Sequence, residues 1–138
     1  MSIVKVEFSL THGQEHYDRL DKEWGDIHPV TRSVVLECAR YVYDRFKKNV
    51  IVTCLIRSVS ENKADGGVPQ SSHLTARAGD FVVPGILLKE AQELIGYVQK
   101  YWGPMICIVY HDAGSGFHFH INTNWPYAVD FTEVRYNA

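Results

Sequence analysis

The sequence has few cysteines, and their arrangement excludes one common kind of metal site. Its 138 residues include only Cys38, Cys54 and Cys107, an odd number with no Cys-x-x-Cys spacing. Each cysteine lies in an apolar stretch, so we predict three buried thiols and no thiolate zinc site.

An excess of charge and a long apolar run are also missing. The chain has 14 Lys and Arg against 16 Asp and Glu, a formal net charge of -2. A basic face for nucleic acid or a membrane surface is therefore not expected. No stretch approaches the roughly 20 apolar residues that cross a bilayer, and the N-terminus lacks the apolar region of a signal peptide. We expect synthesis in the cytoplasm without a signal peptide.

Length and composition indicate one globular domain over residues 1–138. Hydrophobic residues make up 46% and aromatic residues 12%, which is typical of a packed core. A chain of this length has no room for a second full core, and it contains no internal repeat. We expect a monomer.

Apolar spacing predicts an α+β fold. Three- and four-residue intervals predict helices at 29–48 and 87–102. Apolar runs predict strands at 50–56, 79–83, 105–110 and 117–122, with a short strand within 2–9. The remaining segments are read as a loop or irregular helical stretch at 11–28, a long loop at 57–72, a turn at 111–116 and a tail at 124–138 that covers a sheet edge. Short turns between strands favour a mostly antiparallel sheet with helices packed on one side.

Two short sequence motifs contain the candidate residues of a functional site. Residues 71–80 read Ser-Ser-His-Leu-Thr-Ala-Arg-Ala-Gly-Asp, and residues 117–122 read Phe-His-Phe-His-Ile-Asn. They contain His73, Asp80 and His120. Two imidazoles and one carboxylate can bind a single Zn²⁺ and leave its fourth position for water, as in catalytic zinc sites. His118 and His120 are two apart on a predicted strand, so their side chains share one face.

The same residues resemble a known family. The pattern Arg57-Ser58, Asn62, Gly66-Gly67, Ser71-Ser72-His73, Ala78-Gly79-Asp80 and His118-Phe119-His120 is similar to that of the zinc D-Ala-D-Ala carboxypeptidases. Their superfamily includes lysostaphin-type peptidases and the hedgehog amino-terminal domain. Its motif is Ser-x-His-x-x-Gly-x-Ala-x-Asp, followed by a histidine within His-x-His or Glu-x-x-His. The resemblance covers about residues 30–123.

The resemblance implies a role for each matching residue. His73, Asp80 and His120 would bind the zinc ion. Arg57 would match the substrate-binding arginine, because a guanidinium holds a carboxylate or carbonyl through two parallel bonds. Ser71 would bind substrate or brace the loop.

The chain departs from the family motif at two positions. Ala76 replaces the motif glycine, which matters if the backbone there needs a positive φ. Phe117 stands three residues before His120, so the Glu-x-x-His base is missing. His118 is then the nearest candidate for the catalytic general base, with Asp112 in reserve.

The implied activity is hydrolysis of bacterial cell-wall peptides that contain D-amino acids. The cut can be terminal, as in a carboxypeptidase, or internal, as in an endopeptidase. A small enzyme with neither a signal peptide nor a wall-binding domain resembles a phage lysin released at lysis, and a cytoplasmic dipeptidase is also open.

Other readings remain open. His-hydrophobic-His also occurs in DNA endonucleases, where Tyr97 or Tyr101 would attack the DNA. A non-catalytic zinc module that binds peptidoglycan or a protein, and a domain without metal, are further alternatives. The other four histidines are expected to be structural: His12, His16, His28 and His111.

Overall fold

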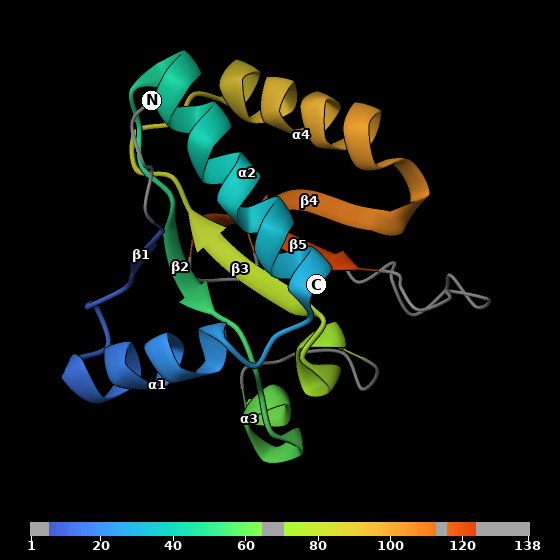
Figure 1. Ribbon diagram of the computed structural model, residues 1–138. Helices are drawn as coiled ribbons and strands as arrows, with labels where there is room; N and C mark the ends of the chain where they lie inside the picture. The colour runs from blue at the N-terminus through green and yellow to red at the C-terminus, as the bar shows by residue number, and fades with distance from the viewer. Residues whose placement is uncertain (1–5, 65–70, 113–115, 124–138) are drawn as a thin grey trace.

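A mixed five-stranded sheet organises residues 6–64, 71–112 and 116–123, which the computed structural model describes (Figure 1). Its strands are β1 (Glu7–Phe8), β2 (Ile51–Cys54), β3 (Ala78–Val82), β4 (Ile106–Asp112) and β5 (Phe117–Thr123). They lie side by side in the order β1-β2-β3-β5-β4. β1 pairs with β2 in parallel, and the other neighbours are antiparallel. The predicted α+β class and the mostly antiparallel sheet are confirmed.

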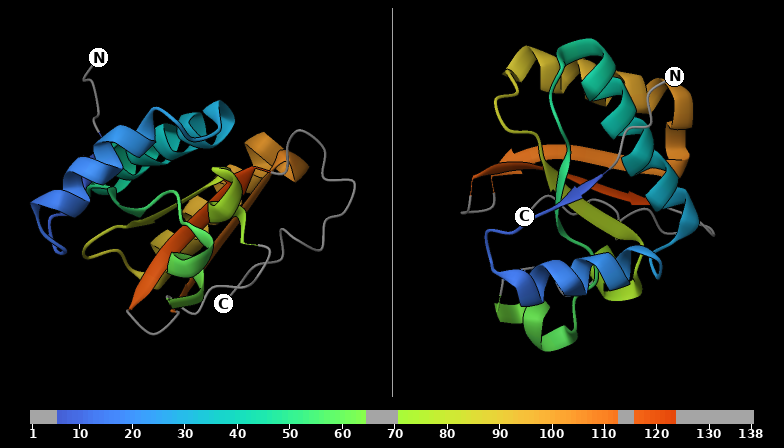
Figure 2. Two further views of the ribbon diagram at one scale, coloured as in Figure 1. Left: turned by 90° about the horizontal axis from the view of Figure 1, so that it is seen from below. Right: turned by 60° about the vertical axis from the view of Figure 1, so that its left-hand side comes forward.

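Helices α2 (Pro29–Phe46) and α4 (Leu88–Trp102) cover one face of this sheet (Figures 1 and 2). Each buries one apolar side against the strands, and among the buried residues are Val35 and Leu94. Beneath them Phe81 of β3 and Phe119 of β5 stack with ring centroids 5.0 Å apart. Burial of each such side chain contributes about 1.5–3 kcal/mol to stability. Within the described ranges, no helix is both long and apolar enough to cross a membrane.

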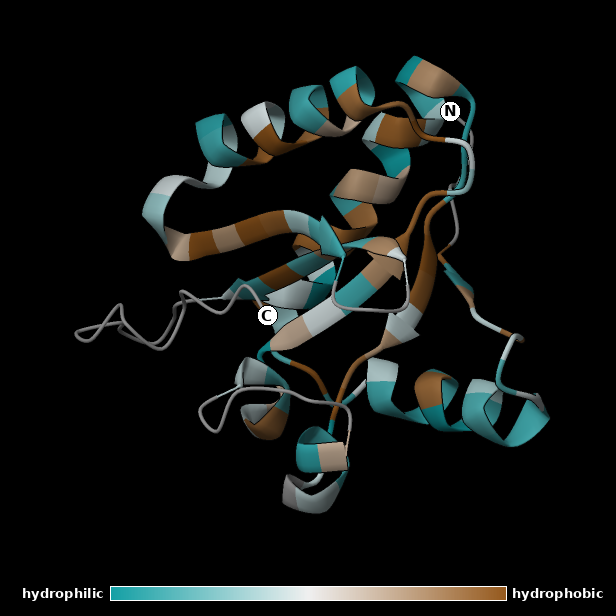
Figure 3. Ribbon diagram, turned by 180° about the vertical axis from the view of Figure 1, so that it is seen from behind, coloured by the Kyte–Doolittle hydropathy of each residue, from teal (hydrophilic) through white to brown (hydrophobic). Residues whose placement is uncertain are grey.

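A regular helix, α1 (Gln14–Trp24), occupies much of the stretch that we expected to be a loop or an irregular helical segment. Only Leu20 of this helix is fully buried, and Figure 3 shows its surface as largely hydrophilic. Side-chain hydrogen bonds attach it to the C-terminal end of β2. His16 Nε2 donates to the Thr53 carbonyl (3.0 Å) and Arg19 Nη2 donates to the Ile56 carbonyl (2.9 Å). Because such polar bonds hold the helix in place of a buried apolar face, its sequence shows little apolar periodicity.

The long predicted loop also contains regular structure. Helix α3 (Val59–Ala64) follows β2, and the 3-10 helix η1 (Ser72–Thr75) precedes β3. β4 continues to Asp112, two residues into the predicted turn. Half of the predicted strand at 2–9 and the whole tail at 124–138 lie outside the described residues.

The two faces of the sheet differ in chemistry because side chains alternate along each strand. The Cβ position of Gly79 would lie 3.6 Å from Val35 Cγ2, so Gly79 faces α2. Asp80, the next residue, therefore points to the opposite face. Its partners across the sheet are Cys54 on β2 and His120 on β5. Polar side chains, among them Cys54, Asp80 and His120, thus gather on the face without α2 and α4.

Candidate metal centre

Asp80 lies between two histidines that come from different parts of the chain. Its Oδ1 is 2.8 Å from Nδ1 of His120 and 3.1 Å from Nε2 of His73. All three residues are buried, and the two histidine side chains have no exposed area. The two phrases singled out in the sequence therefore meet at one point.

The short helix η1 positions His73. Ser71 begins it, and its buried side-chain oxygen accepts a hydrogen bond from the His73 backbone N–H (3.3 Å). Ala76 ends it in the left-handed conformation, with a φ of 57°. The imidazole is then fixed by Nδ1, which donates to the Leu55 carbonyl at 2.6 Å. A carbonyl oxygen only accepts, so in the neutral ring Nε2 carries the lone pair.

His120 is held in the complementary way. Its Nδ1 lies 2.8 Å from Oδ1 of Asp80, and its Nε2 lies 3.0 Å from Oδ1 of Asn122 and 3.4 Å from the Ser72 hydroxyl, so both ring nitrogens have polar partners. The buried Nε2 of His73 faces Asp80 Oδ1 and makes no other polar contact among the described residues. Two imidazole nitrogens and a carboxylate oxygen thus converge on one point. A bound cation satisfies such an arrangement, and imidazole and carboxylate are ligands that zinc accepts.

The charges of the centre point the same way. Burial alone would lower the pKa of His73, but the charge of Asp80, assisted by Cys54, raises this pKa well above its usual value. Burial opposes ionisation of Asp80, yet the His73 charge and bonds from both histidines hold its pKa well below the usual range. Burial lowers the pKa of His120. The centre therefore contains a fixed carboxylate that attracts positive charge, whether a proton or a metal ion.

His118 faces the centre from the outer part of β5. Its Nε2 lies 3.9 Å from Asp80 Oδ2, and its side chain is 14% exposed, so solvent and a ligand can reach it. Asp112, the reserve candidate for the base, pairs with Phe117 and so belongs to the other face. There its Oδ1 accepts from the Gly116 N–H (3.0 Å). His111, expected to be structural, lies directly across from His118 with ring centroids 4.6 Å apart.

Arg57 enters the centre from the segment after β2. Its Nη2 lies 3.8 Å from Asp80 Oδ2, and its Nη1 donates to Oδ1 of Asn62 in α3 (3.3 Å). The side chain is 12% exposed, which leaves part of the guanidinium accessible. Ser71 braces η1, and its binding of substrate stays a prediction.

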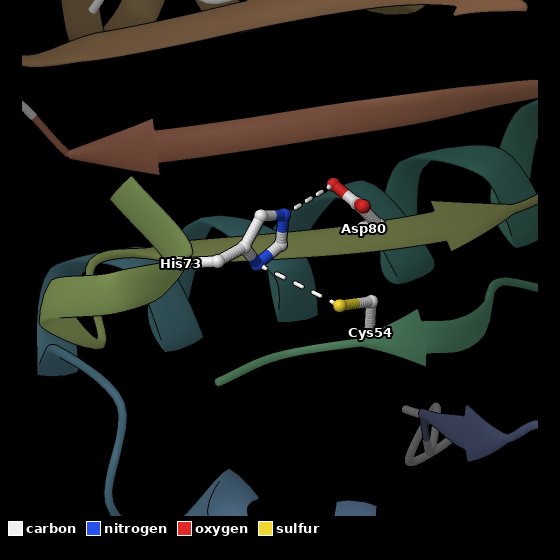
Figure 4. A group of neighbouring side chains, drawn as sticks. All are labelled: Cys54, His73 and Asp80. Atoms are coloured by element: carbon white, nitrogen blue, oxygen red, sulfur yellow. Dashed lines mark hydrogen bonds and ion pairs between the residues drawn. The ribbon is translucent and has the colours of Figure 1, made fainter. Parts of the chain in front are cut away.

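Cys54 is a functional candidate that the sequence reading missed (Figure 4). Its Sγ lies 3.8 Å from Nδ1 of His73. One ligand atom from each of Cys54, His73 and Asp80 can be chosen so that all lie within 4.8 Å of one another. The prediction of three buried thiols is right for Cys38, where burial raises the thiol pKa, but wrong for Cys54 and Cys107, which are partly exposed.

A local irregularity in β2 explains this error. Val52 pairs with Phe81, which faces the helices, whereas Cys54 pairs with Asp80, which faces away from them. Regular alternation would put residues 52 and 54 on one face. A register shift between them turns Cys54 to the other face, as β-bulges do beside functional sites. In the sequence, only the nearby Arg57 suggested that this end of β2 belongs to the site.

Comparison with known proteins agrees with this geometry. A model of the Peptidase M15 family matches residues 14–108, which is more than half of the chain. The match contains Arg57, His73 and Asp80 and ends before His118 and His120. No curated protein and no solved structure matches the chain. The extent of the family match means that this chain belongs to Peptidase M15, a family of metallopeptidases.

Proposed function

We propose that this protein is a zinc peptidase that hydrolyses bacterial cell-wall peptides containing D-amino acids. The observation that carries the proposal is the convergence of His73 Nε2, His120 Nδ1 and Asp80 Oδ1 on one buried point. Family membership supports the reaction class, and the resemblance to D-Ala-D-Ala carboxypeptidases supports the substrate class.

His73, Asp80 and His120 are the proposed zinc ligands. Zinc bound by three protein groups lowers the pKa of a water in its fourth position to about 7 and polarises a carbonyl. The Leu55 carbonyl and the Asn122 side chain, which hold the two rings, contribute by fixing the orientation of each ring.

His118 is the proposed general base. It accepts a proton from the attacking water and later delivers it to the leaving amine, as a positioned imidazole can do near neutral pH. Its partial exposure and its distance of 3.9 Å from Asp80 suit a group that works at the edge of the centre. Arg57 anchors the substrate through a carboxylate or a peptide carbonyl.

Elemental analysis of the purified protein tests the proposal first. We expect about one zinc ion per chain, lost in His120→Ala. Wild type and His120→Ala are then incubated with a peptide ending in D-Ala-D-Ala and with cross-linked wall peptides. Release of terminal D-Ala identifies a carboxypeptidase, and cleavage within the cross-link identifies an endopeptidase. Zinc without hydrolysis would favour a binding module, and no zinc after reconstitution would sink the peptidase proposal.

The endonuclease reading loses its support in this fold. Tyr97 and Tyr101 both belong to α4, and the Tyr97 ring stacks on Tyr41 of α2 with centroids 4.2 Å apart. α4 covers the sheet face opposite to His120 (Figure 1). An attacking tyrosine must lie beside the metal-binding histidines, and these two lie across the sheet from them.

A further inference from the structure

We propose that Cys54 is a fourth protein ligand of the same centre, through which the site captures thiophilic metal ions. The inference rests on the proposed metal site and adds a residue outside the family's ligand motif. It concerns which ions the centre holds and whether its fourth position stays open.

The position of the sulfur carries the proposal. Cys54 pairs with Asp80 across β2 and β3, and the register shift after Val52 turns its side chain to the metal face. In Figure 4 the carboxylate lies against one ring nitrogen of His73 and the thiol lies against the other. Ligand atoms of the three residues lie within 4.8 Å of one another. The sulfur lies 3.8 Å from Nδ1 of His73, whereas Nε2 faces Asp80, so binding an ion held by Nε2 and Asp80 requires the Cys54 side chain to rotate toward the carboxylate.

The neighbouring ring supplies an independent observation. His73 is fully buried, and within the described part of the chain its Nε2 faces the Asp80 carboxylate, 3.1 Å away, and makes no other polar contact. Imidazole nitrogen and carboxylate oxygen are both ligands of zinc, so this pair can hold a cation between them. A cation drawn to His73 and Asp80 has the Cys54 sulfur as its nearest soft donor.

Sulfur changes both the preference and the reactivity of the centre. Thiolates favour soft ions, whereas imidazole and carboxylate accept harder ones. Three protein ligands leave a position for water, and a fourth protein ligand closes the site. The thiol of Cys54 therefore competes with water for the same position. The centre is open with His73, Asp80 and His120 alone, and it is closed when Cys54 binds.

Cobalt substitution tests for the sulfur bond directly. The full-length protein is loaded with Co²⁺, and its absorption spectrum is compared with those of Cys54→Ser and Cys107→Ser. A thiolate bound to Co²⁺ gives an intense near-ultraviolet charge-transfer band, separate from the visible bands of cobalt itself. We expect this band in wild type and Cys107→Ser and its loss in Cys54→Ser, with the visible bands retained. Cys107 is the matched control because it is also partly exposed and pairs with Asn122 of β5.

The outcomes separate this inference from the proposed function. Visible cobalt bands without a charge-transfer band in wild type would refute the role of Cys54 and leave the three-ligand site standing. The absence of all cobalt bands would refute the metal site itself. As a second readout, we expect Cys54→Ser to lower the affinity for Cd²⁺ more than the affinity for Zn²⁺, by about ten-fold or more. Equal losses for both ions would also count against a sulfur ligand.

Discussion

The side chain of Ala76 makes the backbone conformation at the end of η1 energetically costly. It adopts a φ of 57° at the end of η1, directly before the strand that carries Asp80. This conformation costs an L-residue with a side chain about 1–2 kcal/mol, and glycine avoids the cost. The family motif has glycine at this position, so the departure noted in the sequence falls where the backbone does need a positive φ.

We predict that Ala76→Gly stabilises the protein. Relief of the left-handed conformation outweighs the extra entropy of an unfolded glycine, about 0.5–1 kcal/mol, and leaves a net gain of about 0.5–1 kcal/mol. Urea unfolding of the metal-free protein measures it. Ala78→Gly is the matched control, because this buried strand residue should instead lose stability. A loss of stability in Ala76→Gly would contradict the argument.

We predict that His118→Gln removes turnover but leaves metal binding intact. Loss of a general base lowers kcat by about 10²–10⁴-fold. Elemental analysis should still find zinc, because His118 is not one of the three proposed ligands. Asp112→Asn serves as the control and should keep near-normal kcat. A larger loss in Asp112→Asn than in His118→Gln would transfer the role of base to Asp112.

At the scale of single residues, the sequence predicted that His73, Asp80 and His120 lie together. It did not reveal that Cys54 lies beside them. The three residues belong to motifs whose spacing reflects a shared site. Cys54 depends on the register shift after Val52, and a single extra residue in a strand leaves no compositional mark.

At the scale of elements, α2 depends on an unusual cap. His28 precedes it, and its Nδ1 accepts a hydrogen bond from the Val30 N–H (3.1 Å). Burial, and then the charge of Arg77, lower the pKa of His28. Only the unprotonated nitrogen accepts a hydrogen bond, so the cap requires neutral histidine.

We predict that this cap makes stability depend on pH. Because the pKa is lower in the folded state, the contribution is fully present above the unfolded value near 6.5 and is lost as the pH falls below it. His28→Ala should cost about 1 kcal/mol at roughly pH 7.5. His28→Asn keeps a cap that does not titrate, so its stability should fall less on acidification than that of wild type. Identical pH profiles for wild type and His28→Asn would exclude the effect.

Arg19 links α1 to α3 and to the segment that leads to Arg57. It forms ion pairs with Glu23 and Glu61, and its Nη2 donates to the Ile56 carbonyl (2.9 Å). The bond from Arg19, followed by that from the Ser58 backbone, lowers the pKa of Glu61 to about 2. Both side chains of the Arg19–Glu61 pair are 39% exposed, so solvent screens much of this interaction.

We predict that Arg19→Gln costs about 1 kcal/mol near neutral pH, the upper range for exposed pairs. A carboxylate with a lowered pKa stabilises the fold above its unfolded value of about 4.3 and loses this effect as the pH falls toward 2. The difference between wild type and variant should therefore shrink in acid. Chemical unfolding at several pH values measures it, and a constant difference would assign the cost to packing alone.

The elements themselves were predicted unevenly. α2 and α4 pack against the sheet, so their apolar spacing predicted them well. α1 and α3 are held through polar side chains such as Arg19 and through backbone contacts, which carry no period. Their residues were therefore predicted as loops, although both helices border the sheet face that carries Asp80 and His120.

At the scale of the whole molecule, the metal centre joins three segments: η1, β3 and β5. A cation bound at Asp80 would offset the cost of keeping this carboxylate charged in a buried position. Metal binding and global stability are therefore linked.

We predict that zinc stabilises the fold through this linkage. A ligand at 100 times its Kd adds about 2.7 kcal/mol to the free energy of unfolding. Thermal unfolding with zinc and with a chelator measures the increment, which should vanish in Asp80→Asn. The increment is compared within each variant, since the substitution also changes the metal-free stability. A zinc increment that persists in Asp80→Asn would place the ion elsewhere.

The position of β5 in the sheet sets an order of events during synthesis. β5 leaves the ribosome after β3 and β4, yet it lies between them and joins them through hydrogen bonds on both edges. Until it inserts, β4 has no partner in the sheet and His120 is missing from the centre. A nascent chain from which His73 and Asp80 have already emerged therefore has an incomplete site. The peptidase matures only when β5, the last described strand, joins the sheet.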